Sequence, residues 1–267
     1  MSRWCIIISL YATSGNAEYD GSGCDVIVDA ATGKDFPRCG ADAGSACKSI
    51  RGGVEKADSI PGETTVCVKT GEYRTECQDG GIIITTTLTI RAYEPGSAPG
   101  SVTVDCGSKG QQDPAFTFAP AVPASNILHL VDITVKNVLS QSSGSAVAAT
   151  GGALVVNNCH FEKCTSLAKG NIDEHVFYAG GGGALFAQNM RSVALHNSSF
   201  SSCSAPNGAG GAVLVMLEEA APPTGTGIHS NAATASLVTT FTCSIVSTQA
   251  TSEKAEVGKA KAATAAE

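Results

Sequence analysis

Two short motifs recur along the middle of the chain, and this repetition restricts the possible folds more than any other feature. The first is Gly-Gly-Ala followed by a branched apolar residue, and it starts at Gly151, Gly182 and Gly210. The second is Asn-x-x-Phe-x-x-Cys, which spans 158–164 and returns 39 residues later at 197–203. A repeat unit of this size cannot bury its apolar face alone, whereas stacked units can. The motifs therefore predict a stack of similar units.

The segments around these motifs read as short β-strands separated by Gly, Asn and Ser. Examples are 65–68, 82–84, 88–90, 102–104 and 192–195. Residues 130–137 alternate as a half-buried strand would. Short strands in units of about 22–30 residues predict an all-β fold, a right-handed parallel β-helix. Phe161 would then stack on Phe200, and Cys164 and Cys203 would occupy equivalent positions.

One segment follows helical spacing instead. Residues 46–58 place Ala46, Ile50, Val54 and Ala57 on one face, although Gly52-Gly53 weakens the pattern. A helix here would cap the N-terminal end of the stack, within a cap region of about 25–60, because a bare end exposes unpaired backbone groups.

The N-terminus has the layout of a secretory signal. Arg3 supplies a positive charge, 4–11 form a short apolar core, and Gly15 and Ala17 place small residues at the −3 and −1 positions of a cleavage site after Ala17. We therefore expect 1–17 to be a signal peptide and 18–250 to be the β-helix domain. The alternative is that the apolar core is a strand of a chain truncated upstream.

The cysteine count agrees with export. Removing 1–17 takes Cys5 away and leaves ten cysteines, an even number that suits disulfides. Zinc usually takes C-x2-C pairs, which are absent; the closest cysteines are Cys159 and Cys164, with His160 between them. Buried free thiols are the third possibility, because Cys packs as a small apolar residue. The spacing does not decide between disulfides and buried thiols.

Asn197-Ser198-Ser199 is a glycosylation sequon. It has meaning only in a eukaryotic secretory route, and a Ser-rich chain also produces sequons by chance.

The composition excludes several partners. The chain has 17 basic and 24 acidic residues, a formal net charge of −7 and no basic block, so nucleic acid is not expected. No apolar run reaches about 18 residues, so we expect no transmembrane segment. The glycines at 180–183 and 208–211 do not complete G-x-G-x-x-G, and we expect neither a cofactor nor a metal.

Candidates for catalysis are few. Asp173, Glu174 and His175 are adjacent in a predicted loop at 171–181, and such a group could serve as an acid–base or metal cluster. The alternative is a solvated loop, where charges are easily hydrated. A second loop is predicted at 218–230, and the Ala/Lys/Glu-rich segment 251–267 is predicted to be a disordered tail.

The repeats over about 130–216 resemble those of polymorphic outer-membrane proteins and related surface β-helices. That family carries GGA(I/L/V) and F-x-x-N repeats, whereas Cys164 and Cys203 stand here where the family usually has Asn. The resemblance implies a β-helix at a cell surface.

The region of about 25–105 resembles the opening of pectin-lyase-like β-helices. The resemblance rests on Cys39-Gly40 through Cys47-Lys48-Ser49-Ile50, on 64–68 and on 71–73. It implies an extracellular setting and a local disulfide between Cys39 and Cys47. Polysaccharide lyases and hydrolases use this fold, but fold alone does not establish an activity.

From these observations we expect a secreted or cell-surface protein with a non-catalytic binding or adhesion role toward polysaccharide or another surface ligand. The loops at 171–181 and 218–230 would supply specificity. The alternatives are a carbohydrate-active enzyme using Asp173, Glu174 and His175, and a structural fragment of a larger surface protein.

Overall fold

The structure of the chain is a computed structural model. It describes residues 23–41, 44–74, 76–77, 80–94, 96, 98, 100–107, 113–122, 125–169, 171–173, 176–178, 180–208, 211–217 and 236–239. Over these residues the chain forms 21 strands and one helix. The predicted signal at 1–17, the loop at 218–230 and the tail at 251–267 lie outside the described residues.

Most strands belong to three parallel sheets. Sheet A contains β1 (Val26–Val28), β2 (Thr64–Val68), β5 (Leu88–Ala92), β8 (Ile127–Val131), β12 (Ala153–Asn157), β18 (Ser192–His196) and β21 (Ser236–Thr239). Sheet B contains β3 (Gly71–Tyr73), β6 (Val102–Asp105), β9 (Thr134–Lys136), β13 (His160–Glu162) and β19 (Ser199–Ser201). Sheet C contains β4 (Ile82–Ile84), β7 (Phe116–Phe118), β11 (Val147–Thr150), β17 (Leu185–Met190) and β20 (Val213–Leu217). The remaining strands form a parallel pair, β10 (Leu139–Ser140) with β14 (Thr165–Ser166), and an antiparallel pair, β15 (Asn171–Asp173) with β16 (Val176–Tyr178).

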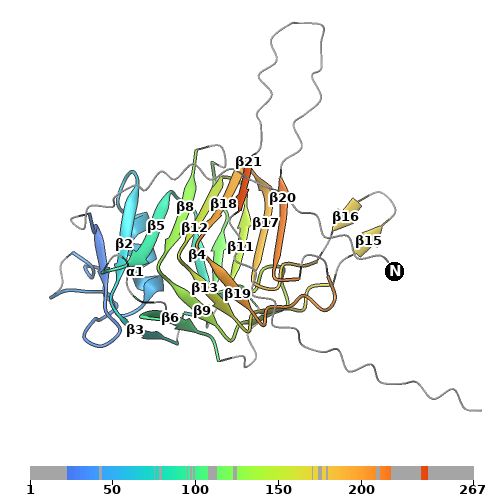
Figure 1. The fold of residues 1–267 in the computed structure, drawn as a ribbon. Coiled ribbons are helices and arrows are strands. Elements are labelled where there is room, and N and C mark those ends of the chain that lie inside the picture. The colour runs from blue at the N-terminus through green and yellow to red at the C-terminus, as the bar shows by residue number, and fades with distance from the viewer. Residues whose placement is uncertain are drawn as a thin grey trace, which may run out of the picture.

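The chain visits the three sheets in a repeating order. From β2 onward it passes from sheet A to sheet B and sheet C and then returns to sheet A, so strands that are neighbours in a sheet are distant in sequence. Figure 1 shows β2, β5, β8, β12, β18 and β21 side by side in the order of their colours. The predicted all-β class is confirmed, with one helix beside the parallel sheets.

The interior is built from columns of apolar side chains. In sheet A the register aligns the buried residues Val66, Ile90, Leu130, Val156 and Leu195 on successive strands. Side chains of a strand alternate between its two faces, so one in-register column forms a continuous apolar surface.

The 39-residue repeat sets the register between β13 and β19. Phe161 pairs with Phe200, and their rings stack with centroids 4.9 Å apart and planes 8° from parallel. The predicted aromatic stack is therefore confirmed.

One of the three Gly-Gly-Ala copies differs in structural position from the other two. The copy at 151–153 leads into β12 of sheet A, whereas the copies at 182–184 and 210–212 lead into the neighbouring strands β17 and β20 of sheet C. Gly182 instead corresponds to Gly144, because Val147 pairs with Leu185. Both glycines have positive φ angles, of 70° at Gly144 and 62° at Gly182, where a Cβ is unfavourable.

The predicted strand over 130–137 is also divided. It contributes the end of β8 and the whole of β9, which belong to sheets A and B. The corner lies at Asp132, which has a φ of 58°. Asp and Asn tolerate this left-handed conformation better than most residues, and Asn158 occupies the equivalent corner after β12 with a φ of 51°.

The predicted helix at 46–58 is present but shorter, because Ser49 caps it: α1 (Ile50–Asp58) begins four residues after the predicted start and packs against β1, β2 and β4. Ser49 is its N-cap and accepts a hydrogen bond from the Gly52 N–H at 2.9 Å. Gly53, one of the two glycines that weaken the helical pattern, is required by packing. A Cβ on Gly53 would approach the Val28 side chain to 2.6 Å, so glycine lets α1 lie close to β1.

Candidate functional site

The prediction of a loop at 171–181 is wrong in part, because Asn171–Asp173 and Val176–Tyr178 form the antiparallel strands β15 and β16. Asp173 ends β15 and pairs with Val176 of β16, while Glu174 and His175 lie outside the described residues. The Asp173 side chain is not described either, so the structure provides no geometry for an acid–base cluster there.

A hollow that the sequence analysis did not identify lies at one end of sheet A. Asp29, Lys69 and Tyr93 directly follow β1, β2 and β5, and the register places Val28, Val68 and Ala92 side by side. The Lys69 N–H donates to the Val28 carbonyl at 2.9 Å, and the Tyr93 N–H donates to the Val68 carbonyl at 2.7 Å. The three residues therefore continue the sheet and line a cavity of about 260 Å³.

The two remaining lining residues of this Tyr93 hollow are Thr70 and Glu94. Tyr93 is 38% exposed, and Phe36, which lines a different hollow, is exposed to a similar extent at 42%. The ammonium group of Lys69 lies over the Tyr93 ring, 5.9 Å from its centroid. The hollow thus combines one exposed aromatic face with hydroxyl, ammonium and carboxylate groups.

Hydrogen bonds hold the Asp29 carboxylate that lines the Tyr93 hollow. The Asp29 carboxylate accepts from the Thr32 hydroxyl at 2.7 Å, from the Ala31 and Thr32 N–H groups at 2.9 and 3.2 Å, and from Lys69 Nζ at 3.1 Å. The pKa of Asp29 is lowered to about 2, chiefly by the hydrogen bond from the Thr32 hydroxyl and further by the two N–H groups and Lys69. Partial burial opposes this shift because it disfavours the charged carboxylate. The Tyr73 hydroxyl donates a hydrogen bond to the Lys69 carbonyl at 2.8 Å, which holds the Lys69 backbone in place.

Asp29 should make folding sensitive to acid. Its pKa falls from 3.8 to about 2 on folding, so its contribution to stability is present above pH 3.8 and is lost as the pH falls toward 2. We expect Asp29→Asn to lower the free energy of unfolding at pH 6 by about 1–2 kcal/mol. Urea denaturation of both proteins between pH 2 and 6 should show the difference shrinking as the pH falls. A difference that stays constant over this range would contradict the assignment.

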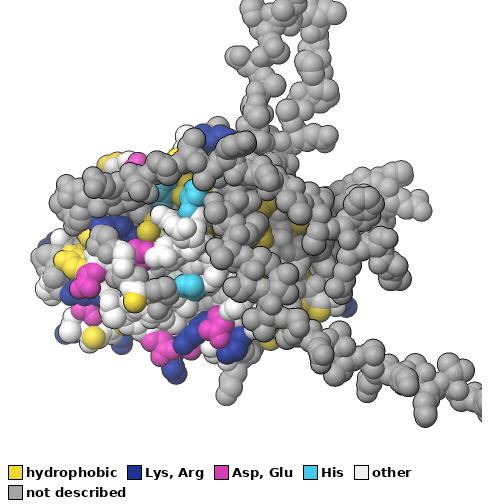
Figure 2. Space-filling view, viewed as in Figure 1, with side chains coloured by type: hydrophobic (Ala, Val, Ile, Leu, Met, Phe, Trp, Pro, Cys, Tyr) yellow, Lys and Arg dark blue, Asp and Glu magenta, His cyan; other side chains and the backbone are white. Residues whose placement is uncertain are grey.

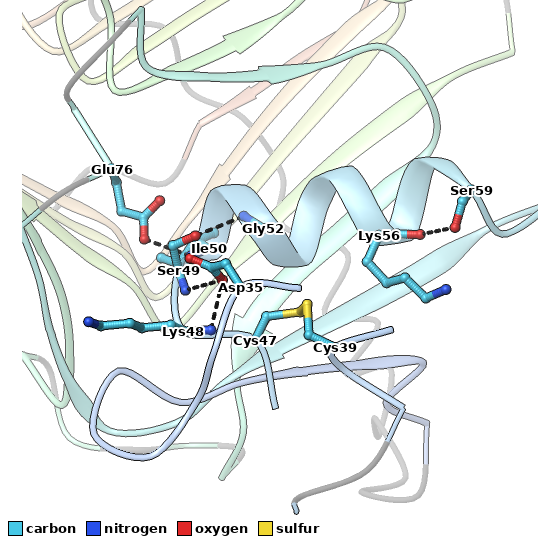
Figure 3. The surroundings of a disulfide bond; sticks show 10 residues. All are labelled: Asp35, Cys39, Cys47, Lys48, Ser49, Ile50, Gly52, Lys56, Ser59 and Glu76. Atoms are coloured by element: carbon cyan, nitrogen blue, oxygen red, sulfur yellow. Dashed lines mark hydrogen bonds between the residues drawn. A yellow bond between two sulfur atoms is a disulfide. The ribbon is translucent and has the colours of Figure 1, made fainter. Parts of the chain in front are cut away.

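A second hollow, of about 380 Å³, lies beside the outer face of α1. Its lining residues are Asp35, Phe36, Pro37, Cys39, Gly52, Glu55, Lys56 and Ser59. Figure 3 shows Asp35 and Glu76 at the N-terminal end of the helix, with the Cys39–Cys47 disulfide beneath it. The Asp35 carboxylate accepts from the Lys48 and Ser49 N–H groups at 2.8 and 3.0 Å, so it holds the loop that leads into α1.

A charged cluster occupies the outer side of sheet B. Lys136 Nζ lies 3.3 Å from Glu72 Oε1 and 3.5 Å from Asp105 Oδ2, and Glu72 also binds Arg74 at 2.9 Å. Figure 2 shows acidic and basic side chains gathered over the region where Figure 1 places β3, β6 and β9. Partial desolvation opposes the shift, but Glu72 and Asp105 hold the pKa of Lys136 above its usual value. Lys136 is therefore held as an ammonium ion and is poorly suited to act as a general base.

The nine cysteines of the described residues form three disulfides and three free thiols, which settles for them whether each is bridged or free. Cys24 is joined to Cys67, Cys39 to Cys47, and Cys77 to Cys106. The Cys39–Cys47 bond is the one that the pectin-lyase-like resemblance implies. Among the described cysteines, Cys159, Cys164 and Cys203 are free. Both uses of cysteine that the sequence allowed therefore occur in one chain.

Asn197 of the sequon is exposed at the corner between β18 and β19, with a φ of 47°. Within the described ranges, no three His, Cys, Asp or Glu side chains are grouped as a metal site. No helix in this part of the chain is long and apolar enough to cross a membrane.

Comparison of the chain with protein-family models, with curated proteins and with solved structures found no match in any of the three.

Proposed function

We propose that this protein is a secreted or surface-exposed right-handed parallel β-helix that binds carbohydrate without catalysis. The cyclic passage through three parallel sheets supports the β-helix, and crossovers between parallel strands are almost always right-handed. The position of α1 against the first strands of sheets A and C supports a role as the N-terminal cap. Three disulfides support an oxidising compartment such as the cell exterior.

The observation that carries the binding proposal is the Tyr93 hollow. An aromatic ring offers an apolar face to the C–H groups of a sugar, while nearby polar groups accept and donate hydrogen bonds to its hydroxyls. Tyr93 supplies such a face, with the Lys69 ammonium group over the ring and Thr70 and Glu94 in the same lining. Three in-register strands hold the backbone of the hollow, so little ordering is required when a ligand binds.

The charges of the Tyr93 hollow favour a neutral glycan. The ammonium group of Lys69 is already paired with Asp29, and Glu94 adds a further carboxylate, so the lining carries no excess positive charge. An acidic polysaccharide would find no excess positive charge to pair with at this position. We therefore propose neutral sugar units as the ligand class.

Tyr93→Ala should weaken glycan binding about tenfold or more, because it removes the apolar platform of the hollow. Tyr93→Phe keeps the ring and should retain most of the affinity. Ile83→Ala is a matched control, because Ile83 is 60% exposed on β4 and does not line the hollow. Calorimetric titration of each variant with neutral and uronic-acid oligosaccharides measures the effect. Equal affinity of wild type and Tyr93→Ala, or binding restricted to uronic acids, would overturn the proposal.

The enzyme alternative has weaker support. A polysaccharide lyase needs a neutral base to take a proton from the sugar, and a hydrolase needs two carboxyl groups in distinct protonation states. The described cluster closest to that arrangement is Glu72, Asp105 and Lys136, in which the lysine is kept protonated. That cluster suits a polar binding surface better than a lyase base.

A further inference from the structure

The 39-residue repeat places two free thiols at equivalent corners, Cys164 between β13 and β14 and Cys203 just after β19. Glu162 pairs with Ser201 and Thr165 with Ser204, so Cys164 and Cys203 lie in register between these pairs. The Ser204 N–H donates to the Cys164 carbonyl at 2.9 Å, which keeps the backbones in parallel register at this point. Neighbouring strands are about 4.8 Å apart, within the usual separation of Cα atoms in a disulfide.

The two sulfur atoms differ in exposure and in proton affinity. Cys164 is fully buried, while Cys203 is half-buried and packs against the edge of the apolar core. The neighbouring Cys203 thiol and burial both raise the pKa of Cys164, whereas the neighbouring Cys164 thiol lowers the pKa of Cys203. Cys203 is thus the thiol that both carries more thiolate and can meet a reagent from solvent.

We propose that Cys203 and Cys164 form a redox-active dithiol that exchanges with small external disulfides, with Cys203 as the attacking thiol and Cys164 as the resolving thiol. This inference is independent of carbohydrate binding. It assigns a modification site on the part of the chain that lies after the three N-terminal disulfides.

Oxidised glutathione is one such external disulfide. The Cys203 thiolate attacks one glutathione sulfur, a Cys203–glutathione bond forms, the glutathione disulfide breaks, and one glutathione thiolate leaves and takes a proton from water. Cys164 then loses its proton to solvent and attacks Cys203 Sγ, which forms the Cys164–Cys203 bond and releases the second glutathione. Two protein thiols are oxidised and one glutathione disulfide is reduced to two glutathione molecules.

Cys159 provides an internal control. Its Sγ donates to the backbone carbonyls of Leu130 and Asn157 at 3.4 Å, and the sulfur atoms of Cys164 and Cys203 likewise each donate to one distant carbonyl and to one carbonyl two residues earlier. Burial raises its pKa to about 12. It resembles Cys203 in its local bonding and differs in exposure and in having no described thiol partner.

The test uses the full chain, folded and with its three disulfides intact. The protein is exposed to oxidised glutathione, remaining thiols are blocked with N-ethylmaleimide, and non-reduced peptides are read by mass spectrometry. Wild type should yield a linked Cys164–Cys203 peptide, and Cys164→Ser should instead accumulate glutathione on Cys203. Cys203→Ser should leave Cys164 and Cys159 as thiols.

A second measurement on wild type alone does not depend on how the variants fold. Timed alkylation of the native protein should modify Cys203 about tenfold or more faster than Cys159, because thiolate content and exposure set the rate. Equal rates at the two sites would overturn the proposal. A wild-type protein in which Cys164 and Cys203 both remain thiols after glutathione treatment would do the same.

Discussion

Phe161→Ala should destabilise the protein by about 3–5 kcal/mol, the usual cost of removing a buried aromatic side chain. Phe161 is 1% exposed and lies in register between Val135 and Phe200. The neighbouring strands are fixed by their parallel ladders, so the surrounding residues cannot collapse into the cavity. Urea denaturation monitored by circular dichroism measures the loss.

Phe200→Ala is the matched comparison. Phe200 forms the other half of the ring stack but is only partly buried, so its truncation should cost clearly less. A loss for Phe161→Ala no larger than that for Phe200→Ala would contradict the placement of Phe161 in the interior.

Glu76→Ala should cost about 2–4 kcal/mol, because it leaves two buried N–H groups of a helix without acceptors. Glu76 is 1% exposed, and its two carboxylate oxygens accept from the Ile50 N–H at 2.6 Å and from the Arg51 N–H at 2.9 Å. Burial raises the pKa of Glu76, and the two N–H bonds oppose this shift because they favour the carboxylate. The side chain thus completes the N-terminus of α1 from 25 residues away.

The local cap provides the comparison for Glu76. Ser49→Ala removes one hydrogen bond, from the Gly52 N–H, and should cost about 1 kcal/mol. Amide hydrogen exchange at Ile50 and Arg51 should accelerate more in Glu76→Ala than in Ser49→Ala. The reverse order would show that Glu76 does not hold the first turn of the helix.

The sequence predicted the elements that are determined by residues close together in the chain. The short strands, the helix and the stacking of Phe161 on Phe200 follow from spacing within one motif or between two close copies. The division of 130–137 was not predictable, because Asp132 makes its corner with partners from distant segments. Its carboxylate accepts from the Gly96 N–H at 3.0 Å and from the Asn158 side chain.

The Gly-Gly-Ala motif shows why similar sequence motifs do not always occupy equivalent structural positions. Glycine is required wherever the chain needs a positive φ or a close backbone approach, and both corners that enter sheet A and corners that enter sheet C meet this condition. The 39-residue repeat was more informative, because Phe161 and Cys164 each have a structural equivalent in the next copy, Phe200 and Cys203.

The Tyr93 hollow could not be identified from the sequence. Its central residues are 29, 69 and 93, which meet only because β1, β2 and β5 pair in one register. The available signal was that each of these residues follows an apolar strand directly. Without the register, nothing distinguishes them from other polar residues at strand ends. The pairs Cys24–Cys67 and Cys77–Cys106 were unpredictable for the same reason, since they depend on the fold.

The central claim, that the protein binds glycans without changing them, is tested most directly by analysing the ligand after binding. The full chain is incubated with the neutral and uronic-acid polysaccharides, with and without calcium, and the products are read by mass spectrometry. We predict that a neutral glycan is retained by wild type, is lost from Tyr93→Ala and is recovered at its original length. Shortened or unsaturated oligosaccharides that disappear with Asp173→Ala or Glu174→Ala would contradict this account and would identify an enzyme.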